Sequence, residues 1–211
     1  MTTSWKGLPG SIPGLWREIN KLRVLRLRES ERQNVWFVAK ALAEISDQQP
    51  STLFKRILPR DQEQLENILR LYEKVKGRSV EEMVEEPFFS ETFLNFHPTL
   101  YQLQFLRSQD RQQSVLWSRQ SGKTTTVGLK LFKFCVLHPA TQATITAPGF
   151  RQSKLVIEKT SDWLYKMNPV ARRAWVEKAL KTVIRLHNRS RMKAFPLALK
   201  RYVERRATSS I

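Results

Sequence analysis

The chain has 211 residues, of which 41% are hydrophobic, so a packed core is affordable and wholesale disorder is not expected. Lys and Arg total 37 against 19 Asp and Glu, and the net charge of +18 favours a polyanionic partner, with nucleic acid the first choice. The single cysteine, Cys135, excludes an internal disulfide, and its apolar surroundings predict a buried thiol. No apolar stretch is long enough to span a bilayer, so we expect no membrane contact and a reducing cytoplasmic location.

The first 90 residues have the periodicity of helices. Gly and Pro residues before position 14 predict a loose arm, and apolar side chains then recur at helical spacing up to Ile45. A second helical stripe runs from Leu65 to Val75. The signals for helix breaks, caps and ends are Pro50, Asp61, Gly77 and the Ser79–Glu82 capping box. We therefore predict a helical N-terminal region over residues 1–90.

Helical and strand-like segments alternate after a phenylalanine-rich connector at 88–96. This order predicts an α/β domain with a parallel sheet over residues 91–211. The expected elements are, in chain order, a helix at 101–107, a strand at 114–117, a helix at 124–137, a strand at 143–146, a helix at 152–167, and two hairpin strands at 182–186 and 192–195 around Asn188.

A phosphate-binding loop is the clearest chemical signal. The triplet Gly122-Lys123-Thr124 matches the end of the pattern G-x-x-x-x-G-K-[ST], although the first glycine position falls on Trp117. The triplet lies between a predicted strand and a predicted helix, where backbone N–H groups and the helix N-terminus face phosphates. Lys123 would reach the β- and γ-phosphates, and the Thr124 hydroxyl would bind Mg²⁺. A strand–turn–helix joint with an incidental lysine is the alternative.

The octet at 118–125 resembles the Walker A motif of terminase large subunits of tailed-phage type, the viral ATPases that pump DNA into procapsids. The resemblance implies an incomplete P-loop NTPase core, with ATP and Mg²⁺ as cofactors and the host-cell cytoplasm as location. It implies catalytic roles for Lys123 and for Arg119, the counterpart of a cis-acting arginine finger. The remaining octet residues implied to bind the cofactor are Ser118, Gln120, Ser121, Gly122, Thr124 and Thr125.

Two flanking segments extend the resemblance. Leu100-Tyr101-Gln102 resembles the adenine-binding Q motif of the family, in which the Gln102 amide would contact the base and the Tyr101 ring would stack on it. Residues 144–148 with Arg151-Gln152 resemble the motif that couples nucleotide state to DNA contact. The implied partners are double-stranded DNA, the terminase small subunit, the portal protein, and a separate chain carrying the rest of the ATPase and the nuclease.

The acidic half of such a site is not recognisable in the sequence. An Asp-Glu pair would complete the Mg²⁺ site and activate water, but Glu204 is the only acid after Phe195 and it is a poor match. We therefore expect an ATPase portion that stops before Walker B, binds ATP and hydrolyses it poorly. The alternatives are another P-loop DNA translocase or helicase, and a basic DNA-binding remnant without enzymatic activity.

Overall fold

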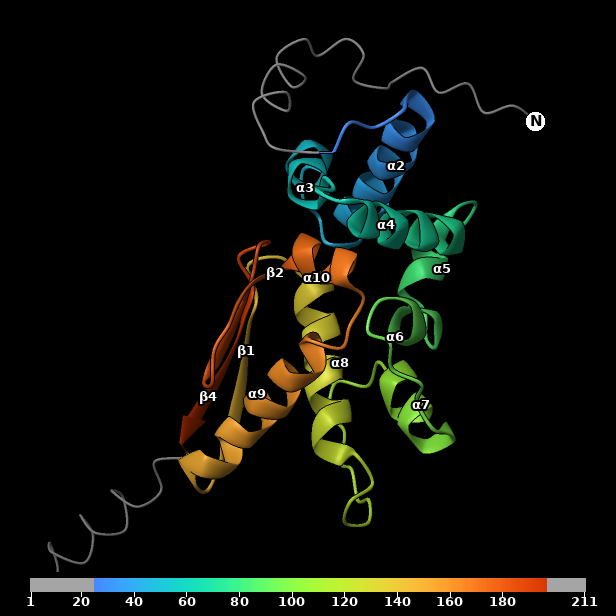
Figure 1. Cartoon of the computed structure of the whole chain (residues 1–211). Coiled ribbons are helices and arrows are strands. Elements are labelled where there is room, and N and C mark those ends of the chain that lie inside the picture. Colours follow the sequence, from blue (N-terminus) through green and yellow to red (C-terminus); the bar gives the residue numbers. More distant parts are fainter. Residues whose placement is uncertain (1–24, 197–211) are drawn as a thin grey trace, which may run out of the picture.

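The computed structural model describes residues 25–196, which form a helical layer followed by a small sheet with its own helices (Figure 1). The helices are α2 (Glu29–Ile45), α3 (Pro50–Ile57), α4 (Gln62–Val75), α5 (Val80–Val84), α6 (Phe88–Thr92), α7 (Leu100–Arg107), α8 (Lys123–Leu137), α9 (Phe150–Leu164) and α10 (Pro169–Trp175). The strands are β1 (Gln142–Ala147), β2 (Val176–Ala179), β3 (Val183–Leu186) and β4 (Arg191–Pro196).

The predicted helix signals of the N-terminal region are confirmed within the described residues. Pro50 lies at the first position of α3, and the Asp61 carboxylate accepts a hydrogen bond of 2.9 Å from the backbone N–H of Gln64 at the start of α4. Gly77 follows α4 with a φ of +76°, and Ser79 and Glu82 form the reciprocal capping box of α5. The predicted arm and the helical pattern before position 25 lie outside the described residues.

The four strands form a mixed sheet, so the prediction of a parallel sheet is wrong. The strand order is β1-β4-β3-β2, in which β1 and β4 are parallel and the other two pairs are antiparallel. The difference arises because a tight turn joins β3 to β4 and a short turn joins β2 to β3, and such turns return the chain in the antiparallel direction. Among the three pairs of neighbouring strands in this sheet, only β1 and β4 are separated by a connection long enough for parallel pairing.

The predicted strand at 114–117 does not form. These residues have no regular secondary structure, and the Leu116 side chain is 97% exposed. An apolar run becomes a strand only where a neighbouring strand pairs with its backbone, and no described strand lies next to this segment in the sheet. The segment is held by contacts of its aromatic side chain instead, as described below.

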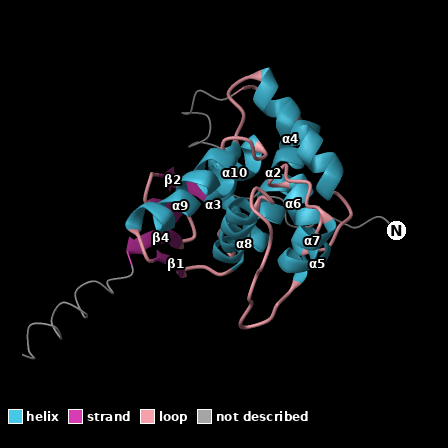
Figure 2. Ribbon diagram, turned by 90° about the horizontal axis from the view of Figure 1, so that it is seen from below, coloured by secondary structure: helices cyan, strands magenta, loops and turns pink. Residues whose placement is uncertain are grey.

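One face of the sheet packs against α8 and α9 (Figures 1 and 2). The side chains that the strands bury on this face are Ala143, Ile145, Ile184, Leu186, Met192 and Ala194. The two helices approach closely at Gly128, where a Cβ atom would lie 2.0 Å from Thr160 Oγ1. Cys135 of α8 is fully buried, as predicted, and burial raises the pKa of its thiol to about 11.

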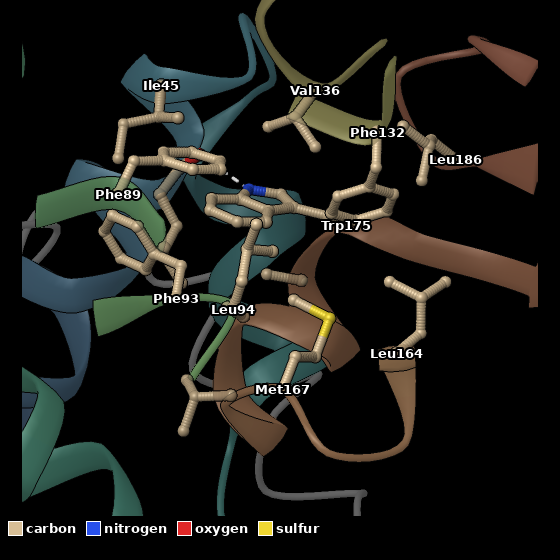
Figure 3. Close-up of a cluster of buried hydrophobic side chains, with 14 of the residues drawn as sticks. Ile45, Phe89, Phe93, Leu94, Phe132, Val136, Leu164, Met167, Trp175 and Leu186 are labelled. Atoms are coloured by element: carbon tan, nitrogen blue, oxygen red, sulfur yellow. Dashed lines mark hydrogen bonds between the residues drawn. The ribbon is translucent and has the colours of Figure 1, made fainter. Parts of the chain in front are cut away.

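Trp175 joins the sheet region to the N-terminal helices (Figure 3). Its ring stacks on Phe89 at 5.7 Å between centroids and meets Phe93 edge-on at 5.2 Å. Its indole Nε1 donates a 3.2 Å hydrogen bond to the carbonyl of Leu42 in α2. Buried side chains from both sides of residue 90 thus form one continuous core.

The predicted hairpin around Asn188 is confirmed, and its turn is fixed to the end of α8. Asn188 Nδ2 donates to the carbonyls of Cys135 and Val136 at 2.8 and 3.0 Å, and its Oδ1 accepts from the Ser190 N–H. Ser190 Oγ donates to the carbonyl of His138 at 2.7 Å. These bonds satisfy carbonyls at the C-terminus of α8, which have no partner within the helix.

Candidate nucleotide-binding loop

The loop that precedes α8 is a tight turn built on two left-handed residues. Gln120 has a φ of +62°, and Gly122, the N-cap of α8, has a φ of +76°. Ser121 Oγ donates to the Ser118 carbonyl at 2.8 Å, which closes the turn on itself. The helix begins at Lys123, so the turn leads directly into its N-terminus.

Several neighbouring backbone N–H groups at this turn have no hydrogen-bond acceptor. In the part of the chain that the structure describes, no N–H of residues 118–125 donates a hydrogen bond to a backbone or side-chain acceptor. The last of them belong to the first turn of α8, where N–H groups have no intrahelical partner and the helix dipole is positive. Such an array favours an anion, and phosphate is the usual one.

The charged side chains of the octet differ in how they are held. Lys123 Nζ donates a 2.8 Å hydrogen bond across the loop to the Trp117 carbonyl, which leaves part of its donor capacity for another acceptor. Arg119 is exposed and has no ion pair or hydrogen bond within the described residues. Thr124 and Thr125 are partly buried in the first turn of α8.

Helix α7 braces the loop through its first turn. Gln102 Nε2 donates to the Ser121 carbonyl at 3.1 Å, and the Tyr101 hydroxyl donates to the same carbonyl at 3.2 Å. Gln102 Oε1 meanwhile accepts from the Thr99 N–H at 2.9 Å and caps α7. The two predicted adenine-binding residues therefore lie against the loop, but the Gln102 amide is buried and bonded to protein on both sides.

Glycine is favoured at position 122 for two reasons. Its positive φ is a conformation that side chains with a Cβ atom rarely adopt. A Cβ atom built there would also lie 2.9 Å from Gln102 Nε2. Gly122 thus contributes both to the backbone turn and to the space in which the Gln102 side chain lies.

Two features of the site were not predicted. The Trp117 ring lies edge-on to Tyr101 and Phe105, at 5.0 and 5.6 Å between centroids, and this contact anchors the segment before the turn. Lys130 Nζ donates to the carbonyls of Phe105 and Ser108 and to Gln113 Oε1, joining α8 to the end of α7. Burial is the main cause of the lowered pKa of Lys130. The aromatic residues at positions 101 and 117 were the only feature of the sequence that indicated the contact of the Trp117 ring.

The other predicted motif residues lie elsewhere. Thr144 and Thr146 are exposed on β1, and Arg151 lies in the first turn of α9. No described hydrogen bond links them to the turn at 117–122. Glu204 lies outside the described residues. Among residues 25–196, no group of three or more His, Cys, Asp or Glu side chains is placed to hold a metal ion.

The described helices include none that is long and apolar enough to cross a membrane. No protein-family model matches the chain, and a search of curated proteins finds no match.

Proposed function

We propose that the turn at 117–125 binds the phosphates of ATP and that the chain is the ATP-binding portion of a DNA-packaging motor of the terminase type. The observation that carries the nucleotide part is the run of backbone N–H groups at 118–125 that have no acceptor, next to the Lys123 ammonium. Neutral and cationic donors that converge on one turn form an anion site.

Each octet residue has a role in this proposal. The N–H groups and Lys123 hold the phosphates, and Thr124 supplies one hydroxyl oxygen to Mg²⁺ when the metal is bound. Arg119 is exposed beside the turn, where its guanidinium can reach a terminal phosphate without first breaking an ion pair. Gln102 and Tyr101 hold the loop carbonyl of Ser121 and so keep the turn in its shape.

A second function is favoured by a different observation. The segment at 114–117 is not a strand, and Lys123 Nζ donates its hydrogen bond to a protein carbonyl. Both features are compatible with a turn that binds no nucleotide. On this alternative the chain is a basic DNA-binding protein without nucleotide chemistry. The two functions differ in whether ATP binds at all.

The test is a titration of the full chain with a fluorescent ATP analogue in the presence of Mg²⁺. Lys123→Ala removes one charged donor, and hydrogen bonds to charged groups contribute about 1.5–3 kcal/mol, so the affinity should fall by about tenfold to a hundredfold. Lys159→Ala, an exposed lysine on α9, removes the same charge away from the turn and should leave the affinity unchanged. No binding by the wild type would support the alternative, whereas equal affinity of the wild type and Lys123→Ala would show that ATP binds away from the turn and would refute the assignment of the turn.

A further inference from the structure

The face of the sheet that points away from α8 and α9 carries a cluster of cations. Residues paired directly across neighbouring strands have their side chains on the same face. Arg191 of β4 pairs with Arg185 of β3, and Arg185 pairs with Lys178 of β2, so these three side chains form one row across the sheet. Lys193 stands two residues beyond Arg191 on β4 and therefore shares the face. All four side chains are exposed.

The remaining side chains of this outer sheet face are those of Gln142, Thr144 and Thr146 of β1, Val183 of β3 and Phe195 of β4. Gln142 pairs with Arg191, Thr144 with Lys193, and Thr146 with Phe195. Gln142 Oε1 accepts a 2.8 Å hydrogen bond from Arg191 Nε, which holds the guanidinium against the sheet with its terminal nitrogens free to donate. None of the helices described packs on this face, since the buried strand residues all point the other way (Figures 1 and 2).

No carboxylate neutralises the cluster within the described residues. None of the four cations takes part in an ion pair of the described chain. The only acidic residue in the four strands is Glu177, which lies at the irregularity of β2. Glu177 makes no ion pair with any of the four cations within the described residues.

We infer that the outer sheet face, defined by Lys178, Arg185, Arg191 and Lys193, binds the phosphate backbone of duplex DNA. Neighbouring strands are about 4.8 Å apart and alternate residues of a strand about 7 Å apart, so the four cations occupy a patch about 10 Å across. A patch this dense in positive charge matches a polymer that carries one negative charge per about 1.7 Å of axis. The sequence continues after β4 with four further cations, Lys200, Arg201, Arg205 and Arg206.

The side chains of the outer sheet face do not favour single-stranded nucleic acid as the partner. They do not favour recognition of the base sequence either. Single-stranded nucleic acid is held by exposed aromatic rings on which bases stack. Phe195 is the one aromatic side chain in the described strands, and the Lys193 ammonium covers its ring at 4.4 Å from the centroid. A broad four-stranded face also cannot enter the major groove as a helix or a two-stranded ribbon does. Binding should therefore be independent of sequence and made through phosphates.

The test measures duplex binding by the full chain across a range of salt concentrations. The triple variant Arg185→Gln, Arg191→Gln, Lys193→Gln removes three cations of the outer sheet face. The matched variant Arg60→Gln, Lys74→Gln, Lys159→Gln removes three exposed cations from α9 and the region of α4. Polarisation of a labelled 20-base-pair duplex gives the affinity of each. Each phosphate contact contributes about 0.9 to the slope of log K against log salt concentration. The slope measured for the first variant should therefore be smaller in magnitude than that of the wild type by about 2.7.

This inference rests on the DNA-binding part of the proposed function, and the outcomes separate the two. If the wild-type chain binds no duplex DNA even at low salt, both the DNA-binding part of the proposed function and the assignment of the outer sheet face are refuted. Equal slopes for the two triple variants would refute the outer sheet face alone and leave diffuse charge as the cause of binding. Loss of self-association instead of DNA binding in the first variant would show that the face contacts a second copy of the chain, and would also refute the inference.

A measurement without substitutions checks the same surface. Duplex DNA should slow the acetylation of Lys178 and Lys193 by an amine-reactive ester, and leave Lys74 and Lys159 unprotected. Uniform protection of all four lysines, or none, would refute the assignment. Lys123→Ala should retain the salt slope of the wild type, since that lysine lies on the turn before α8 and not on the sheet.

Discussion

The close approach of α8 and α9 at Gly128 predicts that Gly128→Ala destabilises the fold, against the usual effect of this substitution in a helix. Replacing a helical glycine by alanine normally stabilises by about 1 kcal/mol. Here the new Cβ would lie 2.0 Å from Thr160 Oγ1 and 3.3 Å from Thr160 Cβ. Thr160 is fully buried, and its hydroxyl donates to the Val156 carbonyl at 2.7 Å, so it has little freedom to move aside.

The magnitude follows from these opposing terms. Overpacking a dense core costs about 1–3 kcal/mol, and displacing the Thr160 hydroxyl from its acceptor adds about 1 kcal/mol. After the gain in helix propensity we expect a net loss of about 2 kcal/mol, or about 4–8 °C in Tm for a chain of this size. Gly149→Ala, at the N-cap of α9, is the control without a steric clash, because a Cβ there has nothing within 4 Å and its φ of −114° is open to alanine.

Urea unfolding followed by circular dichroism measures the effect, and a double variant isolates its cause. Thr160→Ala removes the clashing oxygen, so Gly128→Ala should cost less in the Thr160→Ala background, by at least about 1 kcal/mol. If Gly128→Ala instead stabilises the wild type by about 1 kcal/mol, or if the two changes are additive, the packing argument is wrong.

Three further predictions concern other parts of the molecule. Cys135 should resist thiol reagents at pH 8 and react only on unfolding, because it is buried and its pKa is about 11; rapid labelling of folded protein would contradict this. Lys133→Met should cost about 3–5 kcal/mol in urea unfolding, because it leaves the buried Glu86 carboxylate without its 2.8 Å partner, whereas adding Glu86→Gln should recover much of the loss. Phosphate release from ATP should be at least about a hundredfold below the 1–100 s⁻¹ of complete phosphoryl-transfer enzymes, since no Asp-Glu pair follows Phe195; Lys123-dependent turnover in the normal range would reveal an unrecognised acid.

Local signals in the sequence predicted the helical part of the fold well. The caps at Asp61 and Ser79 and the end at Gly77 depend on hydrogen bonds and backbone angles within a few residues, so the residue types alone indicate them. The hairpin at Asn188 and the strand β1 have equally local signals. These elements were placed to within a few residues.

Features that depend on distant partners could not be predicted in the same way. The apolar run at 114–117 has the composition of a strand, but pairing needs a neighbour that the described sheet does not provide. The sequence places Phe134 in the predicted helix at 124–137 but does not show which way it points; it is 48% exposed, whereas Leu129 and Phe132 of the same helix are fully buried. In the candidate site, the octet was recognisable from its residues, whereas the support of the loop by Trp117 was not, because that contact joins segments far apart in sequence.

The fixation of α8 at both ends has a mechanical consequence. At 1.5 Å per residue, its 15 residues form a rod about 22 Å long. The front end is the turn that we propose to bind phosphates, and the rear end is fastened through Asn188 to the hairpin that carries β3 and β4. A helix is stiff along its axis, so a displacement of the turn along α8 would also load the hydrogen bonds that join its C-terminus to the hairpin. If the turn binds phosphates as proposed and moves along this axis, hydrogen exchange at the Ser190 N–H, which donates to Asn188 Oδ1, should change when ATP is added.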